Sequence, residues 1–428
     1  MKRTPYLILV LVLFATLFAS CGEDRTHEYL EMTEENQWTY SKMKEVYLWR
    51  DHIKEPSRTT FFSTTTKFFN SLIYSGDKVS YFTDTISDGS YGVTFTVMRD
   101  PIGVRPSKVY ALALMVEPGS PADVAGVKRG TWISSVGTAS FTTTKYSFLQ
   151  SGGKTKLVTE AIEFDDETQK YYWEPGDTLQ MDAAVNYTEQ ALYLDSIYTV
   201  REKKIGYLVL NNFYGEEFTQ QTQNALQRFA EGDADEIIID LRYCSGGSIA
   251  NAVSLASSFV PDELHGTPFC ILADADGEID TTYCYTQQQT ALNGKKIYII
   301  TGSLTTGVAE LFATALNKSL PMYDDLLTIG AKSAGANVMT EKFESPYGFS
   351  INPATNQILL ADSTLLQAMT PDYSVNELEQ PEMVHQLGSE QEYMLYNIFY
   401  LASNGMLPGD RSSDGLPVFR KGNKDFIR

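Results

Sequence analysis

"KKIYIITGSLTTGVAELFATALNKS", residues 295–319, decides the fold of this chain. Residues 295–301 are an apolar run typical of a buried β-strand, and residues 307–319 carry apolar side chains at helical spacing. A turn of small residues joins them. A strand, a tight turn and a helix in this order are the geometry with which a nucleophilic hydrolase presents a serine. In this chain the turn contains threonines and Gly307 at the place where a nucleophile would be expected. The segment is therefore either an active site or the backbone framework of one without its nucleophile.

Strands and helices alternate on both sides of this segment. The predicted strands are KIGYLVLNNF (204–213), ADEIIIDLR (234–242) and LLTIGAK (326–332), and helices are predicted over 219–231 and 248–260. Continuous apolar strands are typical of a parallel sheet that is covered on both faces. The pattern therefore predicts an α/β layer with functional residues at the carboxyl ends of the strands.

The pattern differs before residue 200. Apolar residues near helical spacing predict two helices, one around Trp38 and Met43 and one around Phe68 and Leu72. Residues 91–190 read as short strands separated by turns. We therefore expect a multidomain α/β protein with the following segments: signal peptide 1–21, tether and helical unit 22–86, β-rich domain 87–192, α/β domain 200–400 and tail 401–428.

Composition narrows the classes of function. The 428 residues are 43% hydrophobic, enough for sizeable cores. The formal charge of −20 argues against nucleic-acid binding, because such a surface repels phosphates. Three cysteines follow residue 21 and only four histidines occur, none of them four residues apart, so we predict no metal site and no cofactor.

The N-terminus carries a targeting signal. Lys2 and Arg3 precede the apolar run YLILVLVLFATLFAS, which is short for a membrane span and ends at Cys21. The ending LFASC resembles a bacterial lipoprotein signal, in which the cysteine is lipidated after cleavage. This resemblance implies a lipid-anchored protein of the cell envelope, in the outer membrane and facing the periplasm or the exterior. The alternative is an ordinary secretory signal cleaved nearby.

The β-rich segment resembles a PDZ domain. VEPGSPADVAGVKRGTWISSVG, residues 116–137, is similar to the PDZ core, and YGVTF (91–95) is similar to the loop whose amides hold a peptide's terminal carboxylate. Gly92 would let backbone N–H groups converge on an anion. The following strand edge could accept a peptide as an added strand. The residues implied are Tyr91, Gly92, Val93, Thr94 and Phe95.

A PDZ-like unit followed by this α/β layer resembles the S41 family of serine peptidases, the C-terminal processing or tail-specific peptidases, and the resemblance covers roughly residues 36–400. The resemblance rests on KIGYLVLNNF, IIIDLRYCSGGS (237–248), the corner at 297–316, TIGAKSAGANV (328–338) and MTPDYSV (369–375). It implies a ClpP/crotonase-like core after the PDZ-like domain. It also implies a serine nucleophile, a lysine base and an oxyanion hole of backbone amides, here from Gly246, Gly247 and Val308.

Both catalytic positions are substituted in this sequence. Alignment on Glu310 places Gly307 where the family has its serine, and alignment on Gly335 places Ala336 where it has its lysine. Glycine cannot attack a carbonyl and alanine cannot accept a proton. Loss of either group costs a triad-type hydrolase several orders of magnitude in rate. We therefore predict a degenerate peptidase that binds peptides or protein C-termini through the PDZ-like domain and the cleft.

Two other functions stay open. One is an active peptidase with a displaced nucleophile, for which Thr306, Thr305 and Ser303 with the base Lys332 are the candidates. A threonine that begins a helix usually caps it, however, and Lys332 also fits a solvated surface position. Cys244 is better explained as a small buried thiol than as a nucleophile. The other function is an envelope scaffold that neither binds nor cleaves peptides.

Overall fold

The computed structural model describes residues 26–83, 89–141, 152–186, 189–320, 325–380 and 384–408. The chain divides into two compact units. Met1–Ile86 and Thr340–Asn356 make up unit 1, and Ser87–Met339 and Gln357–Arg428 make up unit 2. Cys21 and the apolar run before it lie outside the described residues, so the lipoprotein signal stays a prediction.

Unit 1 combines helices with a small sheet. Its helices are α2 (Thr26–Val46), the 3-10 helices η1 (Arg50–His52) and η2 (Thr60–Phe62), and α3 (Thr65–Leu72). Strands β1 (Tyr81–Thr83), β17 (Ser350–Asn352) and β16 (Phe343–Glu344) pair in that order, antiparallel. Of the apolar positions that predicted these helices, Met43, Phe68 and Leu72 are buried and Trp38 is half-buried.

A six-stranded sheet forms the centre of unit 2. Its order is β19-β14-β13-β10-β9-β8, and all neighbours are parallel except β8 and β9. The bounds are β8 (Leu192–Val200), β9 (Lys203–Leu210), β10 (Glu236–Asp240), β13 (Lys296–Thr301), β14 (Leu326–Gly330) and β19 (Tyr373–Ser374). The strands predicted from apolar runs are present, and their carboxyl ends share one edge of the sheet.

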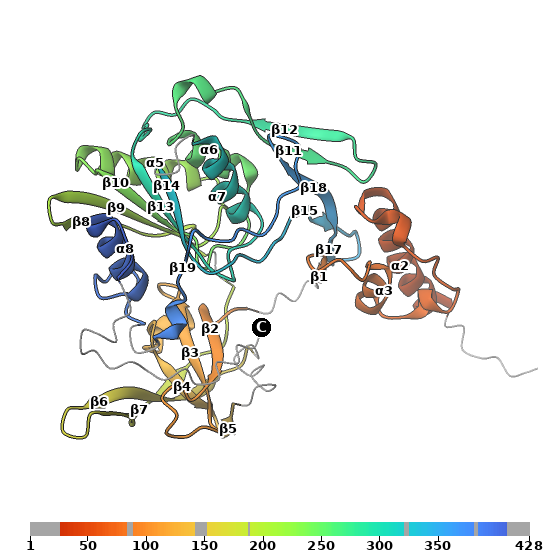
Figure 1. The fold of residues 1–428 in the computed structure, drawn as a ribbon. Coiled ribbons are helices and arrows are strands. Elements are labelled where there is room, and N and C mark those ends of the chain that lie inside the picture. The colour runs from red at the N-terminus through yellow and green to blue at the C-terminus, as the bar shows by residue number, and fades with distance from the viewer. Residues whose placement is uncertain are drawn as a thin grey trace, which may run out of the picture. The chain divides into compact units, whose positions relative to one another are not determined.

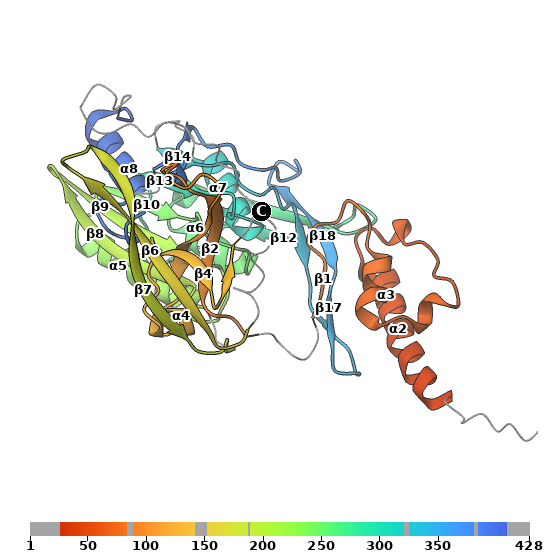
Figure 2. The ribbon, with the colours of Figure 1, turned by 90° about the horizontal axis from the view of Figure 1, so that it is seen from below.

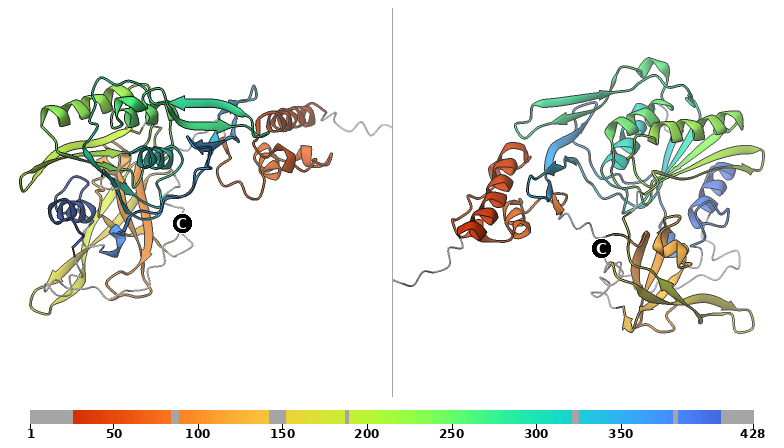
Figure 3. Two further views of the ribbon diagram at one scale, coloured as in Figure 1. Left: turned by 45° about the horizontal axis from the view of Figure 1, so that its top comes forward. Right: turned by 180° about the vertical axis from the view of Figure 1, so that it is seen from behind.

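Side-chain alternation along the strands gives this sheet two buried faces. Ile237 and Ile239 pack in one core with α5 (Phe218–Glu231), α6 (Ile249–Ser257) and α7 (Val308–Ser319). Ile238 packs in a second core with α8 (Tyr393–Asn404), and Figure 3 shows α5 and α8 on opposite sides of the sheet. Helix α8 extends across residue 400, where the sequence predicted the start of the tail.

A four-stranded sheet lies beside the α7 core, in the order β12-β11-β18-β15. Its strands are β11 (Pro268–Ala273), β12 (Ile279–Cys284), β15 (Val338–Thr340) and β18 (Ala354–Leu360), and the short helices η4 (Asp262–Leu264) and η5 (Glu377–Glu379) lie in the connections of unit 2. Cys270 on β11 is buried, and Cys284 on β12 is half-buried; neither forms a disulfide.

The β-rich segment is an antiparallel sheet in the order β2-β3-β4-β6-β7, with β5 beside β4. The bounds are β2 (Val93–Arg99), β3 (Val109–Val116), α4 (Pro121–Val124), β4 (Trp132–Val136), β5 (Ala139–Ser140), β6 (Thr155–Asp165) and β7 (Lys170–Met181). Figures 1 and 2 show the β6–β7 hairpin extending past the other strands, a feature that the sequence analysis did not predict.

The fold class predicted from the sequence, multidomain α/β with a helical N-terminal unit and a β-rich domain before the α/β core, is confirmed. Within the described ranges, no helix has the length and apolar character needed to cross a bilayer. In the same part of the chain, no group of three or more His, Cys, Asp or Glu side chains is arranged to hold a metal ion.

Candidate active site

Gly307 occupies the corner between β13 and α7. Its backbone angles are φ 60° and ψ −116°, a conformation that costs a residue with a side chain about 1–3 kcal/mol. A nucleophile elbow is a strained strand-to-helix turn of this kind. A Cβ atom added at Gly307 would meet only the Cα of Gly246, at 3.7 Å. The corner therefore has room for a side chain, and the sequence supplies none.

The buried carboxylate of Glu310 joins this corner to the segment TIGAKSAGANV (328–338), called here the second motif. Its Oε2 accepts hydrogen bonds from the N–H of Gly307 at 3.0 Å and of Ala336 at 2.8 Å. Its Oε1 accepts from the N–H of Gly335 and the hydroxyl of Ser333. Gly307 and Ala336 thus flank a single oxygen atom. From the sequence, Glu310 is explained by the favourable effect of a negative charge in the first turn of a helix. The only sequence signal for its role in the site is an acidic residue within the otherwise apolar stretch VAELFATAL.

The glycine turn after β10 contacts the same corner through its backbone. Gly246 donates its N–H to the carbonyl of Thr306 at 3.2 Å, and Thr306 donates to the carbonyl of Cys244 at 3.2 Å. The Gly246 N–H is therefore already bonded within the protein. Gly247 has φ 132°, and a Cβ atom there would lie 2.4 Å from the Cβ of Phe213, so packing alone requires this glycine. Val308 begins α7, where N–H groups have no partner within the helix.

The displaced-nucleophile candidates are not assembled into a pair. The buried hydroxyl of Thr305 donates to the carbonyl of Leu241 at 2.6 Å and accepts from the N–H of Gly302 at 2.8 Å. Ser303 and Lys332 are exposed, and Thr306 is half-buried. Among the described residues, no hydrogen bond joins Lys332 to any of these three hydroxyls.

Cys244 lies in the glycine turn with its side chain completely buried. Burial, and to a lesser extent the charge of Asp240, raise the pKa of the thiol well above its ordinary value. A thiol that stays protonated at neutral pH is a poor nucleophile. The geometry agrees with the packing role that its residue type suggested.

Of the five residues predicted as the PDZ-like loop, Tyr91 and Gly92 precede β2, and Val93, Thr94 and Phe95 are its first residues and pair with β3; β2 is an edge strand of its sheet. Gly92 has φ 73°; its N–H donates to the hydroxyl of Ser90 at 3.0 Å and its carbonyl accepts from the N–H of Glu117 at 2.8 Å. The Tyr91 carbonyl accepts from the N–H of Ala122 at 2.9 Å, which ties the loop to α4. Tyr91 and Gly92 therefore form a turn that leads directly into the edge strand β2, which begins at Val93.

The other edge of this sheet, β7, is unsuited to pairing. Pro175 has no N–H to donate, and the ladder between β6 and β7 shifts register beside it. Strand β2, Val93–Arg99, contains neither proline nor glycine, and its one charged residue is Arg99 at the end. Of the two edges, β2 is the one that could accept an extended peptide.

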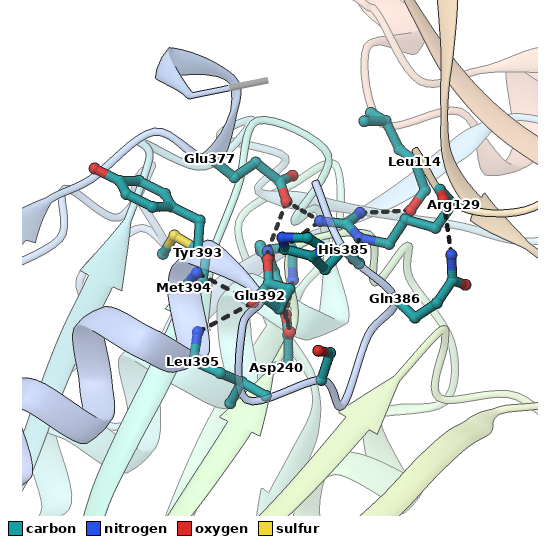
Figure 4. A network of polar contacts seen from close by, with 12 residues as sticks. Leu114, Arg129, Asp240, Glu377, His385, Gln386, Glu392, Tyr393, Met394 and Leu395 are labelled. Carbon is teal, nitrogen blue, oxygen red and sulfur yellow. Dashed lines mark hydrogen bonds and ion pairs between the residues drawn. The ribbon is translucent and has the colours of Figure 1, made fainter. Parts of the chain in front are cut away.

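A buried polar network joins the β-rich domain to the α/β core (Figure 4). Arg129, between α4 and β4, pairs with Glu377 and, at 3.2 Å, with Glu392. Arg242, just after β10, pairs with the same two carboxylates at 2.6 and 2.7 Å and with Asp240 at 2.6 Å. Sequence reasoning missed this network, because nothing in the sequence indicates that residues so far apart meet.

Further contacts complete the network. Arg129 donates to the carbonyl of His385 at 2.7 Å and to the hydroxyl of Tyr243 at 2.6 Å, and Tyr243 donates to Glu377. Glu392 also caps α8, where it accepts from two backbone N–H groups. Every member is thus satisfied, as buried charges must be.

Glu117 forms a second polar contact between the β-rich domain and the core. It follows β3, is nearly buried, and accepts a hydrogen bond from the Asn211 side chain after β9. Burial raises the pKa of Glu117 to about 7, and the negative charge of Glu189 adds to the shift, while the Asn211 hydrogen bond opposes it. The carboxyl therefore titrates near neutral pH.

This shift predicts a pH-dependent stability. The folded chain holds the Glu117 proton more tightly than the unfolded chain, so the stabilisation is complete below about pH 4.5 and is lost as the pH rises through about 7. The Glu117→Gln variant should lack this slope and should gain about 2 kcal/mol over the natural chain between about pH 5 and pH 8. Urea unfolding across that range measures it. The exposed Glu216→Gln change is the control, and parallel profiles for both variants would contradict the assignment.

The candidate site lies in a segment that matches a known protein family. Residues 204–375 match the model of peptidase family S41, and residues 34–81 match the model of the peptidase S41 N-terminal domain. The chain belongs to peptidase family S41. The first match contains the corner, the glycine turn and the second motif, and the second match falls in unit 1.

Two solved structures show how this S41 chain compares in fold. A Bacteroides fragilis protein assigned to the S41 proteases aligns with a TM-score of 0.73 and 23% identity, over 86% of this chain and 97% of the other. The photosystem II D1 C-terminal processing protease aligns with a TM-score of 0.51 and 15% identity, over 82% and 94% of the two chains. At these low sequence identities, the two alignments show a similar fold.

Proposed function

We propose that this S41 family member binds polypeptides without cleaving them. The observation that carries the proposal is the Glu310 carboxylate, which brings together Gly307 and Ala336, the positions matched to the family's nucleophile and base. Neither residue can transfer a proton or form an acyl intermediate. The Gly246 N–H, a candidate oxyanion donor, is bonded to Thr306.

Two features support binding of a peptide. Peptidases of this family bind protein C-termini, and the turn at Tyr91 and Gly92 leads into the edge strand β2, whose first residues are Val93, Thr94 and Phe95. A peptide added there would gain main-chain hydrogen bonds, and its terminal carboxylate would meet the loop. The surface at the Gly307 corner would hold an extended segment of the same or another chain.

The same proposal includes a tether to the bacterial cell envelope through lipid on Cys21. It is supported by the basic start, the apolar run and the sequence LFASC. A tethered, non-cleaving receptor would hold protein C-termini close to the membrane surface.

Labelling and binding experiments on the purified chain test the function. We expect no reaction with a fluorophosphonate probe and no digestion of casein, because within the described part of the chain Lys332 is hydrogen-bonded to none of the candidate hydroxyls of Ser303, Thr305 and Thr306. We also expect the immobilised chain to retain peptides from a random-sequence pool, with several-fold more from a pool with free C-termini than from an amidated one. Mass spectrometry of the retained peptides gives the ratio.

Each contrary result points to a different function. Labelling that disappears in the Thr306→Ala variant and persists in Thr314→Ala would establish the displaced-nucleophile peptidase. Retention of neither pool would leave a scaffold without peptide binding. Equal retention of both pools would remove the PDZ-like loop from the function and leave the cleft.

A further inference from the structure

A small cavity lies at the carboxyl ends of three parallel strands of the central sheet. It has a volume of about 70 Å³ and is lined by Thr301 at the end of β13, by Ala331 just after β14 and by Val375 just after β19. Leu114 of β3 and Met394 of α8 also line it, and both appear beside the polar network in Figure 4. Open α/β sheets bind their ligands in crevices at such strand ends, so this is a position at which a ligand is expected.

The charged residues in the wall of this cavity are already paired. The Arg242 guanidinium contacts three carboxylates. Glu377 accepts hydrogen bonds from the Tyr243 hydroxyl and from both arginines of the network. The Thr301 hydroxyl donates to the carbonyl of Ala331 at 2.9 Å. A charged ligand would disturb these pairs, whereas an apolar ligand would leave them intact, so the wall favours an apolar ligand.

The rest of the wall is rich in aliphatic side chains and sets a limit on the size of the ligand. The apolar lining residues are Leu114, Leu304, Val375, Leu378 and Met394. Contact with them would remove the apolar surface of a ligand from water. A dry apolar cavity of about 150 Å³ can hold a benzene molecule. At about half of that volume, this cavity has room for the side chain of valine or leucine and is too small for an indole ring.

Leu304 connects this cavity to the Gly307 corner. Its side chain is 45% exposed although it also lines the cavity, and the neighbouring lining residue Ser303 is exposed as well. These two residues therefore form part of the mouth of the cavity. Leu304 and Gly307 are three residues apart, a span of at most about 10 Å. A polypeptide that lies at the corner can thus place one of its side chains in the cavity.

We propose that this cavity binds one small aliphatic side chain, that of valine or leucine, from a polypeptide held at the Gly307 corner. This assignment rests on the proposed function and names the type of residue that the corner selects. It requires no free C-terminus, because the recognised group is a side chain.

Sequencing of the amidated random peptides that the immobilised natural chain retains tests this assignment. Amidation removes the terminal carboxylate and so isolates the corner from the PDZ-like loop. Relative to the starting pool, we expect valine and leucine to be enriched at least about fivefold over tryptophan, because the cavity admits the small side chains and excludes the indole ring.

The Leu304→Ala variant should reduce this enrichment to less than about twofold, because it removes the aliphatic side chain at the mouth of the cavity. Ile279→Ala is the matched control, since Ile279 is an exposed aliphatic residue of β12 that does not line the cavity. The enrichment should be unchanged in this control. Both side chains are exposed, so both variants should keep the melting temperature of the natural chain.

The outcomes separate this assignment from the proposed function. Retained peptides without enrichment of valine and leucine, or with tryptophan enriched as strongly, would overturn the assignment and leave peptide binding in place. An enrichment that Leu304→Ala leaves unchanged would do the same. A natural chain that retains the free-acid pool and not the amidated one would also overturn the assignment, since binding would then belong to the PDZ-like loop. Retention of neither pool would overturn both proposals.

Discussion

Replacing Arg242 with methionine should lower the free energy of unfolding by about 3–5 kcal/mol, the cost of removing one partner from a buried ion network. Arg242 pairs with Asp240, Glu377 and Glu392, and its side chain is 3% exposed. Methionine fills much of the volume, but it leaves Glu377 and Glu392 with Arg129 as their cationic partner and removes the cation that pairs with Asp240. The penalty comes from this uncompensated negative charge more than from lost contacts.

The pKa of Glu377 shows how strongly the arginines act. Burial disfavours its ionised form, yet attraction by Arg129 and Arg242 outweighs burial and lowers the pKa to about 2. A lowered pKa stabilises the folded chain above about pH 4.5, and this contribution is lost as the pH falls toward 2. The Arg242→Met variant should therefore lose most stability near neutral pH and least in acid.

Urea unfolding at neutral pH measures the difference, with Arg228→Met as the matched control. Arg228 pairs with Asp195 at 2.8 Å, but its side chain is 51% exposed, so we expect a loss of at most about 1 kcal/mol. If Arg242→Met yields too little folded protein, Glu377→Gln provides a milder break of the same network. Equal small losses in Arg242→Met and Arg228→Met would show that the network does not hold the domains together.

The sequence predicts the fold better than the contacts between its parts. Apolar runs such as IIIDLR are local patterns, and strand alternation with helices follows from them. The Gly307 corner was recognisable for the same reason, since strand, turn and helix are adjacent in the chain. Arg129 and Glu377 pair although they are distant in sequence, and no local sequence pattern around either residue predicts its partner.

The role of Glu310 shows the same limit within the candidate site. The helix dipole already explains an acidic residue in the first turn of a helix. Nothing in the sequence therefore predicts that Glu310 accepts four hydrogen bonds across two motifs. Site residues brought together by tertiary structure need coordinates.

Restoring both missing groups should create activity. The double variant Gly307→Ser and Ala336→Lys should react with a fluorophosphonate probe at least about a hundredfold faster than the natural chain, because loss of either group from a triad-type hydrolase costs about 10⁴ or more. Gly307 already has elbow-like backbone angles, with the nearest atom to an added Cβ 3.7 Å away. The N–H groups of Gly307 and Ala336 donate to the same oxygen of Glu310. A lysine at position 336 would therefore extend from a turn that lies next to the serine at position 307.

The controls test whether the lysine must stand at position 336, or whether any lysine in the same turn is enough. Gly307→Ser alone lacks a base, and Gly307→Ser with Ala334→Lys places the amine on an exposed residue of the same turn, so neither should react above background. Only a lysine that loses water becomes a neutral base at neutral pH, which the exposed position does not allow. Reaction of the Ala334→Lys combination at the same rate as the Ala336→Lys one would show that proximity to Glu310 is irrelevant. A silent but folded double variant would show that the site has lost more than two side chains, with the bonded Gly246 N–H as the first feature to examine.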